Sequence, residues 1–489
     1  MQLSEIIKGV TPLKIKGPRA IDIKGITSDS RAVKKGYMFA AIKGNNLDGS
    51  RFIRDAVTKG AVCIVSEDAI EGGRASLIEV KDVRSAYAKL CANFFKHPSQ
   101  KIKVIGITGT NGKTTTAFLI QAILKKCGYK CGRITTIDYA AGRKRLDALN
   151  TTPDAVLLQE MLKDMADEKF DYCVMEASSH ALHQKRTDSV KFHSAVFTNL
   201  SREHLDYHAG MDEYFLCKKK LFDQLTKKDN AIVNLDDEYG RKLLSGIKSN
   251  VISYGFGKEA KVRAENAEST AGGSSLLLVT PKGSMNISTS LIGRHNIYNI
   301  LAAVSAALPE KINMNVVKKA IDEFKAPAGR LQAINTADAG ISVYVDYAHT
   351  DDALEKVLSS LSALKRKRII TVFGCGGDRD KTKRPRMGKV AVRFSDFVII
   401  TSDNPRSEDE YEIISQIEKG IPKDFKNYLI MIDRKEAIDK AIQMAKDGDI
   451  ILIAGKGHET YQIFKDRKVH FNDKEVASSA LREKRKCLL

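Results

Sequence analysis

The chain has 489 residues, of which 80 are Lys or Arg and 60 are Asp or Glu, so its formal net charge is +20. At roughly 100–200 residues per domain, this length predicts about three domains. A composition of 43% hydrophobic and 29% charged residues excludes wholesale disorder. No run approaches the ~18 apolar residues that cross a bilayer, and the first residues lack the apolar core of a signal peptide. We therefore expect no membrane insertion.

The cysteines and the positive charge bear on location and partners. The eight cysteines form no CxxC pair and no zinc-ligand spacing, which is typical of reduced thiols in a cytoplasmic protein. The net charge raises the alternative of nucleic-acid or anionic-surface binding. However, the basic runs at 365–368 and 484–486 contain no interleaved aromatic residues. The charge is better explained by a lysine-rich surface around a site that handles anions, with no nucleic-acid partner.

Short apolar runs alternate with helical patterns along nearly the whole chain, which predicts α/β units. A helix is expected at 83–95, and the polar stretch after it places a first boundary at 98/99. A second boundary at 332/333 gives three α/β domains, 1–98, 99–332 and 333–489. The predicted strands are 104–108, 172–175, 195–198, 231–234, 343–346, 369–373, 397–401 and 450–454. Polar residues follow each strand, where open α/β sheets bind ligands.

A glycine-rich loop follows the strand at 104–108. It consists of Gly109, Thr110, Asn111, Gly112, Lys113, Thr114 and Thr115, and a predicted helix at 117–127 comes next. Glycines let backbone N–H groups approach phosphate oxygens, Lys113 offers a charge to the β- and γ-phosphates, and Thr114 offers a hydroxyl to Mg²⁺. The spacing departs from the strict phosphate loop because Gly106 lies one residue too early. The strand–loop–helix order nevertheless predicts an ATP site.

This loop resembles that of the Mur ligases, the ATP-dependent amide-forming enzymes of peptidoglycan synthesis, and of their folylpolyglutamate synthetase relatives. The resemblance continues from about residue 20 to about residue 465, with the motifs in family order. It implies an N-terminal UDP-MurNAc-binding domain, a central P-loop ATPase-like domain and a C-terminal Rossmann-like domain that binds an amino acid. Lys113 is then a catalytic residue.

Two polar residues at predicted strand ends suggest a metal site. Glu176 and His204 offer a carboxylate and an imidazole, which could hold a Mg²⁺ that also contacts the nucleotide. In isolation, either residue is more often an ordinary loop residue. The resemblance implies that both are catalytic Mg²⁺ ligands together with Thr114.

A lysine run at 218–220 reads by itself as a solvated helix face, and that interpretation is kept for Lys219 and Lys220. The resemblance implies that Lys218 is catalytic and carbamylated, so that its carbamate helps to position Mg²⁺. Cys217 stands where the family usually has Ala.

The resemblance also implies nucleotide contacts in three later segments. Asn296 is expected near the adenine, Arg330 at the phosphates and Asp346 at the ribose. Gln332 replaces the usual Glu and keeps only its hydrogen bonding. Asp351 stands where Pro is common.

The acceptor site is implied by two groups of residues. The loop containing Ser28 and Ser30 is by itself a commonplace turn, but it is similar to the UDP-holding loop of the branch that extends a muramoyl dipeptide. Ser50 departs from the His usual in that branch. The remaining expected acceptor contacts are Asn150, Thr151, Thr152, Ser178, Gln184 and Arg186. A guanidinium at Arg186 suits an acceptor rich in phosphates and carboxylates.

The segment Asp403-Asn404-Pro405-Arg406 resembles the motif of family members that add meso-diaminopimelate, whereas lysine-adding members usually lack its arginine. The expected contacts are Arg379, Asp403, Asn404, Arg406, Gly455 and Glu459. The distal amino-carboxylate of diaminopimelate needs a guanidinium for its carboxylate and acidic or amide oxygens for its ammonium. L-lysine has no distal carboxylate, so it would leave the arginine charge uncompensated.

Together these motifs imply an ATP-dependent ligase that acts through an acyl phosphate on UDP-MurNAc-L-Ala-D-Glu, with Mg²⁺ as cofactor and small molecules as its only expected partners. Such a reaction belongs to cell-wall synthesis and so bears on cell shape and division. We expect a cytoplasmic monomer whose domains close before chemistry. A lysine-adding ligase or another ligase of the family stays as the near alternative, and a P-loop nucleic-acid-binding ATPase as the remote one.

Overall fold

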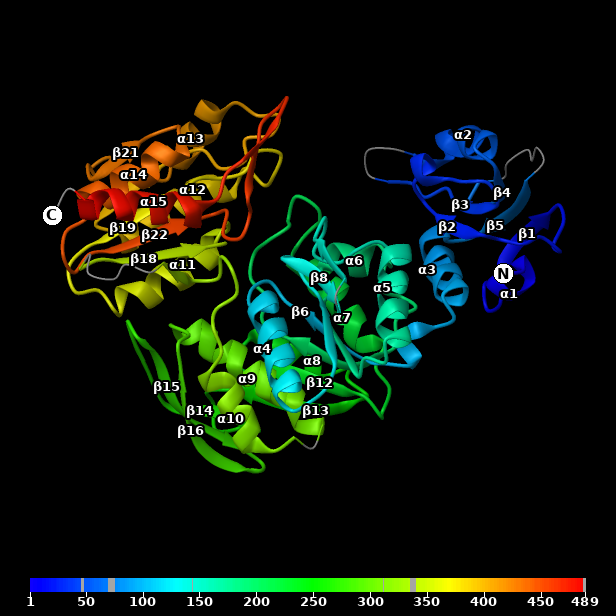
Figure 1. The fold of residues 1–489 in the computed structure, drawn as a ribbon, viewed down its shortest axis with the longest axis horizontal. Helices are drawn as coiled ribbons and strands as arrows, with labels where there is room; N and C mark the ends of the chain where they lie inside the picture. The colour runs from blue at the N-terminus through cyan, green and yellow to red at the C-terminus, as the bar shows by residue number, and fades with distance from the viewer. Residues whose placement is uncertain (45–47, 69–74, 143, 311, 335–339, 487–489) are drawn as a thin grey trace.

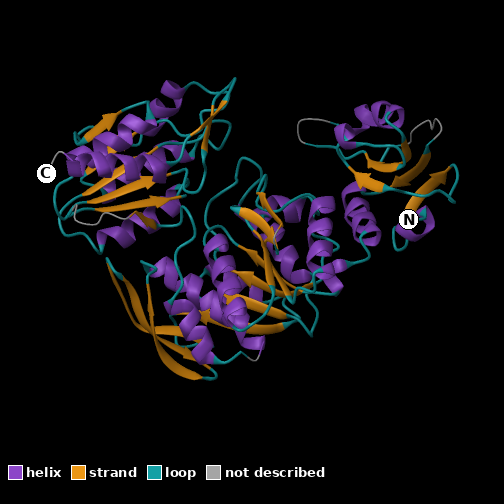
Figure 2. Ribbon diagram, viewed as in Figure 1, coloured by secondary structure: helices purple, strands orange, loops and turns teal. Residues whose placement is uncertain are grey.

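The computed structural model describes residues 1–489 except 45–47, 69–74, 143, 311, 335–339 and 487–489. Three lobes follow one another along the chain, each built on its own large sheet (Figure 1). Helices cover these sheets in every lobe, as Figure 2 shows. The expected α/β class with three domains is confirmed. Within the described ranges, no helix has the length and apolar character needed to cross a bilayer.

The first domain is a five-stranded sheet in the order β1-β5-β4-β3-β2. Its strands are β1 (Pro12–Lys16), β2 (Gly25–Thr27), β3 (Tyr37–Ala40), β4 (Ala61–Ser66) and β5 (Ser76–Val80). Its helices are α1 (Leu3–Ile6), α2 (Ile53–Thr58) and α3 (Val83–Phe94), with 3₁₀ turns at Ser30–Ala32 and Gly49–Phe52. The helix expected at 83–95 is therefore confirmed, and it begins where Asp82 accepts a hydrogen bond from the Ser85 amide at 2.9 Å.

The central domain holds an eleven-stranded sheet in the order β16-β15-β14-β13-β12-β11-β6-β10-β7-β8-β9. The four predicted strands are β6 (Lys103–Thr108), β10 (Tyr172–Glu176), β11 (Phe192–Phe197) and β12 (Asn230–Asn234). They are adjacent in the sheet in the order β10-β6-β11-β12, and each pairs with its neighbour in parallel. The other strands are β7 (Cys131–Ile134), β8 (Asp138–Ala141), β9 (Lys144–Asp147), β13 (Asn250–Gly255), β14 (Val262–Thr270), β15 (Gly273–Thr280) and β16 (Gly283–Thr289). These strands were not predicted from the sequence: β7, β8 and β9 are only four residues long, and β14 and β16 expose several polar residues.

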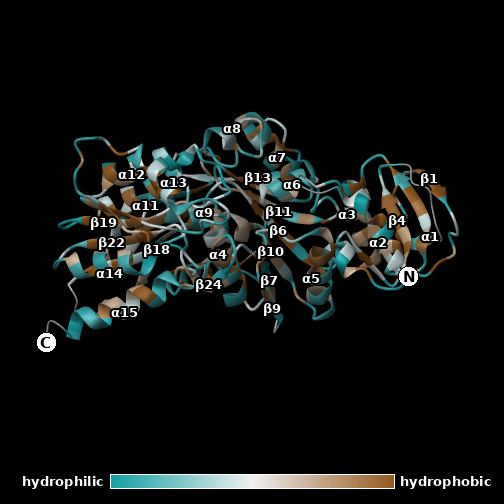
Figure 3. Ribbon diagram, turned by 90° about the horizontal axis from the view of Figure 1, so that it is seen from above, coloured by the Kyte–Doolittle hydropathy of each residue, from teal (hydrophilic) through white to brown (hydrophobic). Residues whose placement is uncertain are grey.

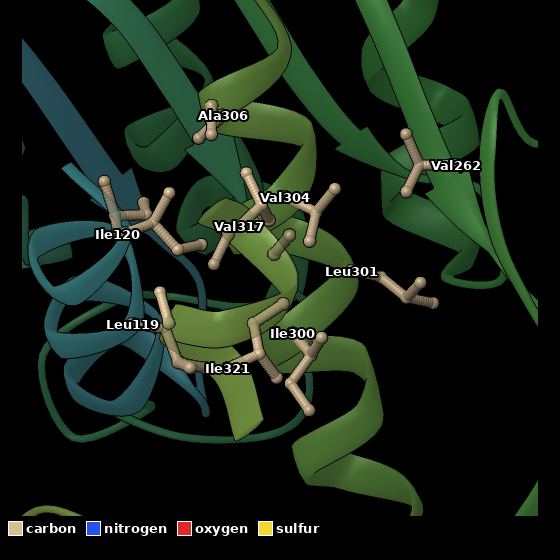
Figure 4. Close-up of a cluster of buried hydrophobic side chains, with 14 of the residues drawn as sticks. Leu119, Ile120, Val262, Ile300, Leu301, Val304, Ala306, Val317 and Ile321 are labelled. Carbon is tan, nitrogen blue, oxygen red and sulfur yellow. The ribbon is translucent and has the colours of Figure 1, made fainter. Parts of the chain in front are cut away.

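Helices cover both faces of the central sheet. They are α4 (Lys113–Lys126), α5 (Ala155–Asp167), α6 (Ser179–His183), α7 (Met211–Asp223), α8 (Glu238–Leu244), α9 (Arg294–Ala307) and α10 (Met314–Asp322), with 3₁₀ turns at Pro98–Gln100 and Leu308–Glu310. On one face, Leu119 of α4, Ile300 of α9 and Ile321 of α10 share a core with Val262 of β14 (Figure 4). This core fixes the start of α4, where the phosphate loop ends.

The third domain has a six-stranded sheet in the order β17-β18-β22-β19-β20-β21 and a small two-stranded sheet. Its strands are β17 (Gln332–Ile334), β18 (Ser342–Asp346), β19 (Ile369–Phe373), β20 (Phe397–Ile400), β21 (Tyr428–Ile430), β22 (Ile450–Ala454), β23 (Tyr461–Ile463) and β24 (Lys468–His470). Its helices are α11 (Asp351–Ser362), α12 (Lys383–Phe394), α13 (Glu410–Glu418), α14 (Arg434–Met444) and α15 (Asp473–Lys486). Strands β18, β22, β19 and β20 are parallel, so their carboxyl ends gather at one edge.

The last helix, α15, packs against the third domain through one apolar face and one buried ion pair. Figure 3 shows alternating teal and brown patches along α15, as expected of an amphipathic helix. Its buried residues include Ala477, Ala480 and Leu481, which share a core with α14. Asp473 forms an ion pair with Arg434 at 2.8 Å, and both side chains are fully buried.

Packed backbone and helices help to connect the domains. Helix α3 of the first domain packs on α5 of the central domain, where Ala155 joins the first domain's core. The chain enters the third domain through Gly329, which has a φ of +64° and lies so close to Gly457 that an added Cβ would be 2.2 Å from the Gly457 carbonyl carbon. The Gly329 carbonyl also accepts a hydrogen bond from the Tyr347 amide at 2.8 Å. Gly329 is therefore held by the third domain.

Candidate active site

A cavity of about 780 Å³ lies where the central and third domains meet. On the central side, its lining comes from the phosphate loop and from residues at the carboxyl ends of β10 and β11. On the other side, it comes from segments that follow β18, β19, β20 and β22. Parallel strands from two sheets thus point their polar ends at one space, as the strand-end pattern predicted.

The phosphate loop depends on two glycines. Gly109 has a φ of +143°, and an added Cβ there would be 1.9 Å from Thr198 Oγ1. Gly112 has a φ of +85°, and its Cβ would be 2.4 Å from Asn299 Oδ1. Lys113 Nζ folds back and donates to the carbonyls of Gly109 at 3.0 Å and Thr110 at 2.7 Å. The ammonium therefore stands over the loop, where a phosphate can meet it.

The buried carboxylate of Glu176 lies beside this loop. It accepts hydrogen bonds from Thr114 Oγ1 at 2.8 Å, from the Thr136 amide at 3.0 Å and from Thr136 Oγ1 at 3.0 Å. These partners are neutral, and no cationic side chain in the described part of the chain forms an ion pair with this carboxylate. A carboxylate and a hydroxyl that meet at a phosphate loop form an oxygen-rich donor set, which suits Mg²⁺.

The imidazole of His204 also lines the cavity, on a residue with a φ of +57°. Burial, aided by the neighbouring His180, Lys218 and Lys113, lowers the pKa of His204 to about 3. The ring is therefore neutral at pH 7 and can offer a lone pair to a cation.

Lys218 lies behind the phosphate loop rather than on the cavity wall. Its side chain is buried, and Nζ donates to the Gly109 carbonyl at 2.8 Å and stands 4.4 Å from the ring centre of Tyr214. Burial, and next the charge of Lys113, hold the pKa of Lys218 well below its usual range. Gly109 and Lys218 are thus in direct contact with each other, although neither lines the cavity.

The three residues expected to bind the nucleotide outside the phosphate loop, Asn296, Arg330 and Asp346, all line the cavity. Asn296 is held by its own bond to the Ile292 carbonyl at 2.8 Å and accepts one from Asn299 at 3.0 Å. Asp346 accepts the amides of Leu331 at 2.5 Å and Ala348 at 2.7 Å, while burial raises its pKa. Its carboxylate thereby shapes the loop that carries the neighbouring Arg330.

Arg330 makes contacts in both domains. Its guanidinium lies 4.8 Å from the ring centre of Tyr347, and Nη2 donates to Thr114 Oγ1 of the phosphate loop at 2.8 Å. A second bond between the domains runs from Asn111 Nδ2 to Asp352 Oδ2 at 2.6 Å. Gln332, which the sequence predicted to hydrogen-bond without charge, accepts the Gly329 amide at 3.0 Å.

Four of the residues expected to contact the acceptor line the cavity: Asn150, Thr151, Ser178 and Arg186. The other two central residues position Arg186, because its guanidinium donates to the Thr152 carbonyl at 2.9 Å and to Gln184 Oε1 at 2.6 Å. Ser28 and Ser30 follow β2 in the first domain and are not among the residues that line the cavity. Figure 1 shows that domain as a separate lobe beyond α5.

Two arginines of the third domain face the cavity without a carboxylate partner among the described residues. Arg406 Nη1 donates to the Gly377 carbonyl at 2.7 Å, and Arg379 Nη1 donates to its neighbour's carbonyl at 2.8 Å. Burial, and next the charge of Arg406, lower the pKa of Arg379. Two neighbouring guanidiniums with unused N–H groups form a site for an anion such as a carboxylate.

Acidic and amide groups lie in the same part of the cavity. Asn404 Nδ2 donates to Glu459 Oε2 at 2.8 Å, and the fully buried Lys456 donates to the same oxygen at 3.2 Å. Asp403 lies against Gly455, where an added Cβ would be 2.5 Å from Asp403 Oδ2. All six residues expected to bind the amino acid therefore line one cavity.

Several lining residues were missed by the sequence reasoning, and two of them matter most. Thr136 anchors Glu176 but follows β7, a strand that was not predicted, so the strand-end signal was absent. His458 lies inside a motif that was noticed, between Lys456 and Glu459, and its ring centre is 5.0 Å from that of Tyr347. Burial, with Arg330 nearby, lowers the pKa of His458 to about 4. The other missed residues include Arg202, Asp206, Lys383 and Arg386.

A phosphate loop with a carboxylate and an imidazole beside it, facing a second α/β domain, is the arrangement of a three-domain P-loop nucleotide-binding protein. Comparison with protein families gives the particular family. Residues 22–95 match the Mur ligase family catalytic domain, 107–307 the Mur ligase middle domain, and 329–457 the Mur ligase glutamate ligase domain. The chain belongs to the Mur ligase family.

The similarity to curated relatives covers nearly the whole chain. A UDP-N-acetylmuramoyl-L-alanyl-D-glutamate–2,6-diaminopimelate ligase from Clostridium perfringens is 43% identical over 491 aligned positions, covering 99% of this chain and 100% of the relative. The ligase of the same name from Clostridioides difficile is 43% identical, and the alignment covers 98% of this chain and 99% of that relative. A solved structure of a ligase of that name has a TM-score of 0.70 at 30% identity, with 99% of both chains covered. MurF from Acinetobacter baumannii shares the fold, with a TM-score of 0.68 at 19% identity and 98% of both chains covered.

Proposed function

We propose that this chain is an ATP-dependent ligase that joins meso-2,6-diaminopimelate to UDP-MurNAc-L-Ala-D-Glu in peptidoglycan precursor synthesis. The observation that carries the proposal is the pair of guanidiniums at Arg379 and Arg406, which lie with Asn404 and Glu459 in a cavity that also contains a phosphate loop. The names of the relatives, at 43% identity over nearly the full chain, support the same substrates. A site for one amino acid and a site for ATP then share one space.

The proposed reaction transfers the γ-phosphoryl group of ATP to the free γ-carboxylate of D-Glu. An amino group of diaminopimelate attacks the resulting acyl phosphate, the tetrahedral intermediate expels inorganic phosphate, and the amine gives up a proton. The products are the amide, ADP and phosphate. The protein supplies little covalent chemistry, so the rate depends on placing three substrates and on neutralising phosphoryl charge. Lys113 and Arg330 both bring a positive charge into contact with the phosphate loop.

The metal set proposed is Thr114, Glu176, His204 and carbamylated Lys218, with Lys113, Lys218, Glu176 and His204 as the catalytic residues. When bound there, Mg²⁺ would neutralise phosphate oxygens and orient them. Carbamylation needs an uncharged amine to attack CO₂, and a buried lysine beside Lys113 meets that condition. The bond from Lys218 Nζ to the Gly109 carbonyl places this nitrogen beside the phosphate loop.

The nucleotide contacts proposed are the phosphate loop with Asn296, Arg330 and Asp346. The acceptor contacts proposed are Asn150, Thr151, Thr152, Ser178, Gln184 and Arg186, with Ser28 and Ser30 holding the uridine diphosphate in the first domain. Arg379, Asp403, Asn404, Arg406, Gly455 and Glu459 would bind diaminopimelate. We further propose a first boundary at 98/99, a monomer, and action in the cytoplasm. The second boundary, expected at 332/333, would divide β17 (Gln332–Ile334) and follows Gly329, which is held by the third domain, so we place it at residues 325–328 instead.

Phosphate release tests this function. The full chain is assayed with ATP, Mg²⁺ and UDP-MurNAc-L-Ala-D-Glu, and the added amino compound is meso-diaminopimelate, L-lysine or D-Ala-D-Ala. We expect turnover only with diaminopimelate, together with an ADP and amide product in equal amounts. Equal turnover with L-lysine would overturn the assignment of the amino acid. ATP hydrolysis that depends on DNA or RNA and ignores the muramoyl peptide would overturn the ligase proposal.

A further inference from the structure

Three side chains outside the cavity form a cluster with the chemistry of a second metal site. They are His208, in the loop before α7, and Glu213 and Cys217 on α7 itself. Their ligand atoms all lie within 4.8 Å of one another. None of the three lines the cavity, and the proposed ligase reaction uses none of them.

The local fold brings the three together. Glu213 and Cys217 are four residues apart, so they lie on one face of α7. The loop turns back toward that face because the His208 amide donates to the His204 carbonyl at 2.9 Å. Glu213 fixes the same turn, since one of its carboxylate oxygens accepts the Ala209 amide at 2.6 Å. Its other oxygen remains directed toward His208.

The distances match those between ligands of one metal ion. His208 Nδ1 lies 3.8 Å from Cys217 Sγ and 3.9 Å from Glu213 Oε1. Around tetrahedral Zn²⁺, bond lengths of about 2.0–2.3 Å place two ligand atoms roughly 3.3–3.6 Å apart. The two distances from His208 exceed this spacing by a few tenths of an ångström, and the third pair, Glu213 and Cys217, lies within 4.8 Å. A thiol–imidazole hydrogen bond explains the first distance by itself, but it gives no role to Glu213.

The surroundings suit a metal as well. The His208 ring is buried between aromatic neighbours, with ring centres 4.9 Å away at Tyr207 and 5.1 Å away at Tyr214. Its Nδ1 is the ring nitrogen that faces the cluster, while its Nε2 has no hydrogen-bond partner among the described residues. The Glu213 side chain is 40% exposed, which leaves a path for an ion and a coordination position for water.

We propose that His208, Glu213 and Cys217 bind one Zn²⁺, or a divalent ion of similar softness, at a site separate from the proposed Mg²⁺ site. A sulfur and an imidazole nitrogen favour zinc over magnesium, which prefers oxygen ligands. Binding converts the Cys217 thiol to a thiolate, and the proton leaves to solvent. The inference does not depend on the ligase function.

The proposed zinc site lies next to two of the proposed Mg²⁺ ligands in the sequence. His208 lies four residues after His204, and Cys217 immediately precedes Lys218. A bound ion would therefore tie the loop that carries one proposed Mg²⁺ ligand to the helix that carries another. We expect it to stabilise the folded chain and to fix the spacing of these two groups.

Cobalt substitution tests the site on the full chain without ATP or peptide. Thiolate bound to Co²⁺ gives a near-ultraviolet charge-transfer band, which Co²⁺ held only by oxygen and nitrogen cannot give. We expect one equivalent of Co²⁺ to produce the band, Zn²⁺ to abolish it, and excess Mg²⁺ to leave it unchanged. Absence of a thiolate band would overturn the proposal.

Variants then show which thiol gives rise to the charge-transfer band. Cys217→Ala should lose it and weaken binding by at least the roughly 10–100-fold that loss of an outer metal-site partner costs. Cys127→Ala, which removes a half-buried thiol elsewhere, should behave as the parent chain does. Glu213→Gln should keep the band with weaker binding. Zn²⁺ should raise the melting temperature of the parent but not of Cys217→Ala, whose metal-free melting temperature reports its folding. A band or Zn²⁺ stabilisation that survives Cys217→Ala would overturn the site.

Discussion

The two ends of the cavity are built by different means. At the central end, the phosphate loop is backbone shaped by glycines, and neighbouring side chains fit against it so tightly that an added Cβ at Gly109 would overlap Thr198. At the third-domain end, long side chains from four strand ends converge, and Arg379 and Arg406 keep unused donors. A site made of backbone leaves a strict local pattern in the sequence, whereas a site made of converging side chains depends on the whole fold. The substitutions below test that contrast.

The largest expected effect is at Lys113. Lys113→Ala removes the charge that stands over the loop, so the rate should fall by about 10²–10³-fold or more. The fold should persist, because the start of α4 is fixed by its core. Phosphate release measures the rate, and Lys125→Ala, an exposed lysine at the far end of the same helix, is the control. Near-parental turnover in Lys113→Ala would remove this residue from the proposed chemistry.

Lys218 should have a similar effect for a different reason. Lys218→Ala deletes the nitrogen that would carry the carbamate, and we expect a loss of roughly 10²–10³-fold. A small carboxylate such as acetate should restore part of the activity, because it can occupy the vacated space beside the loop. Lys219→Ala is the matched control one residue along α7. Full activity, or a loss that no carboxylate rescues, argues against a carbamate.

At the other end, Arg406→Lys keeps the charge but removes the planar fork that binds a carboxylate through two bonds. The ratio kcat/KM for meso-diaminopimelate should fall by about 10–100-fold, which corresponds to the loss of roughly 1.4–2.7 kcal/mol. The low activity with L-lysine should change less, so the preference shrinks. Arg393→Lys on the exposed face of α12 serves as control. If both substrates lose equally, Arg406 does not determine the preference.

The smallest effect on turnover is expected at Glu408. This residue does not line the cavity, but it holds together the two loops that carry Arg379 and Arg406. Its carboxylate binds the fully buried Arg384 through two bonds of 2.8 Å and 2.9 Å and accepts the Asp378 amide at 2.6 Å. The bonds to Arg384, outweighing burial, lower the pKa of Glu408 to about 2. Glu408→Gln should cost about 3–5 kcal/mol of stability, because it leaves Arg384 buried without a charge partner.

The same pair predicts an acid dependence. A carboxyl with a depressed pKa stabilises the fold above its unfolded pKa near 4.5, and this contribution is lost as the pH falls toward about 2. Denaturant unfolding between these pH values should show a smaller decline for Glu408→Gln than for the parent chain. An unchanged decline would show that Glu408 is not responsible.

The sequence predicted eight parallel strands of the central and third sheets and the strand–loop–helix order of β6 and α4, because both follow from patterns within a few residues. The strands β18, β19, β20 and β22 begin and end within one residue of their expected positions. It missed β7–β9, which are only four residues long, and β13–β16, of which β14 and β16 expose several polar residues. Thr136 was missed together with β7. It also could not separate residues that line the cavity from those that hold them, because Gln184 and Thr152 position Arg186 only through the tertiary fold.

The contact between Gly329 and Gly457 defines how the two large domains can move. Phe324 packs in the core of the central domain, while Gly329 is bound to Tyr347 and fits against the third domain's backbone. The pivot for any rotation is therefore confined to the few residues between them, 325–328. Arg330 lies just beyond that pivot and rotates with the third domain, yet it is bound to Thr114 on the central one. A rotation that opens the cavity would lengthen this bond. The relative orientation of the two domains is therefore coupled to the contacts of Thr114 in the phosphate loop.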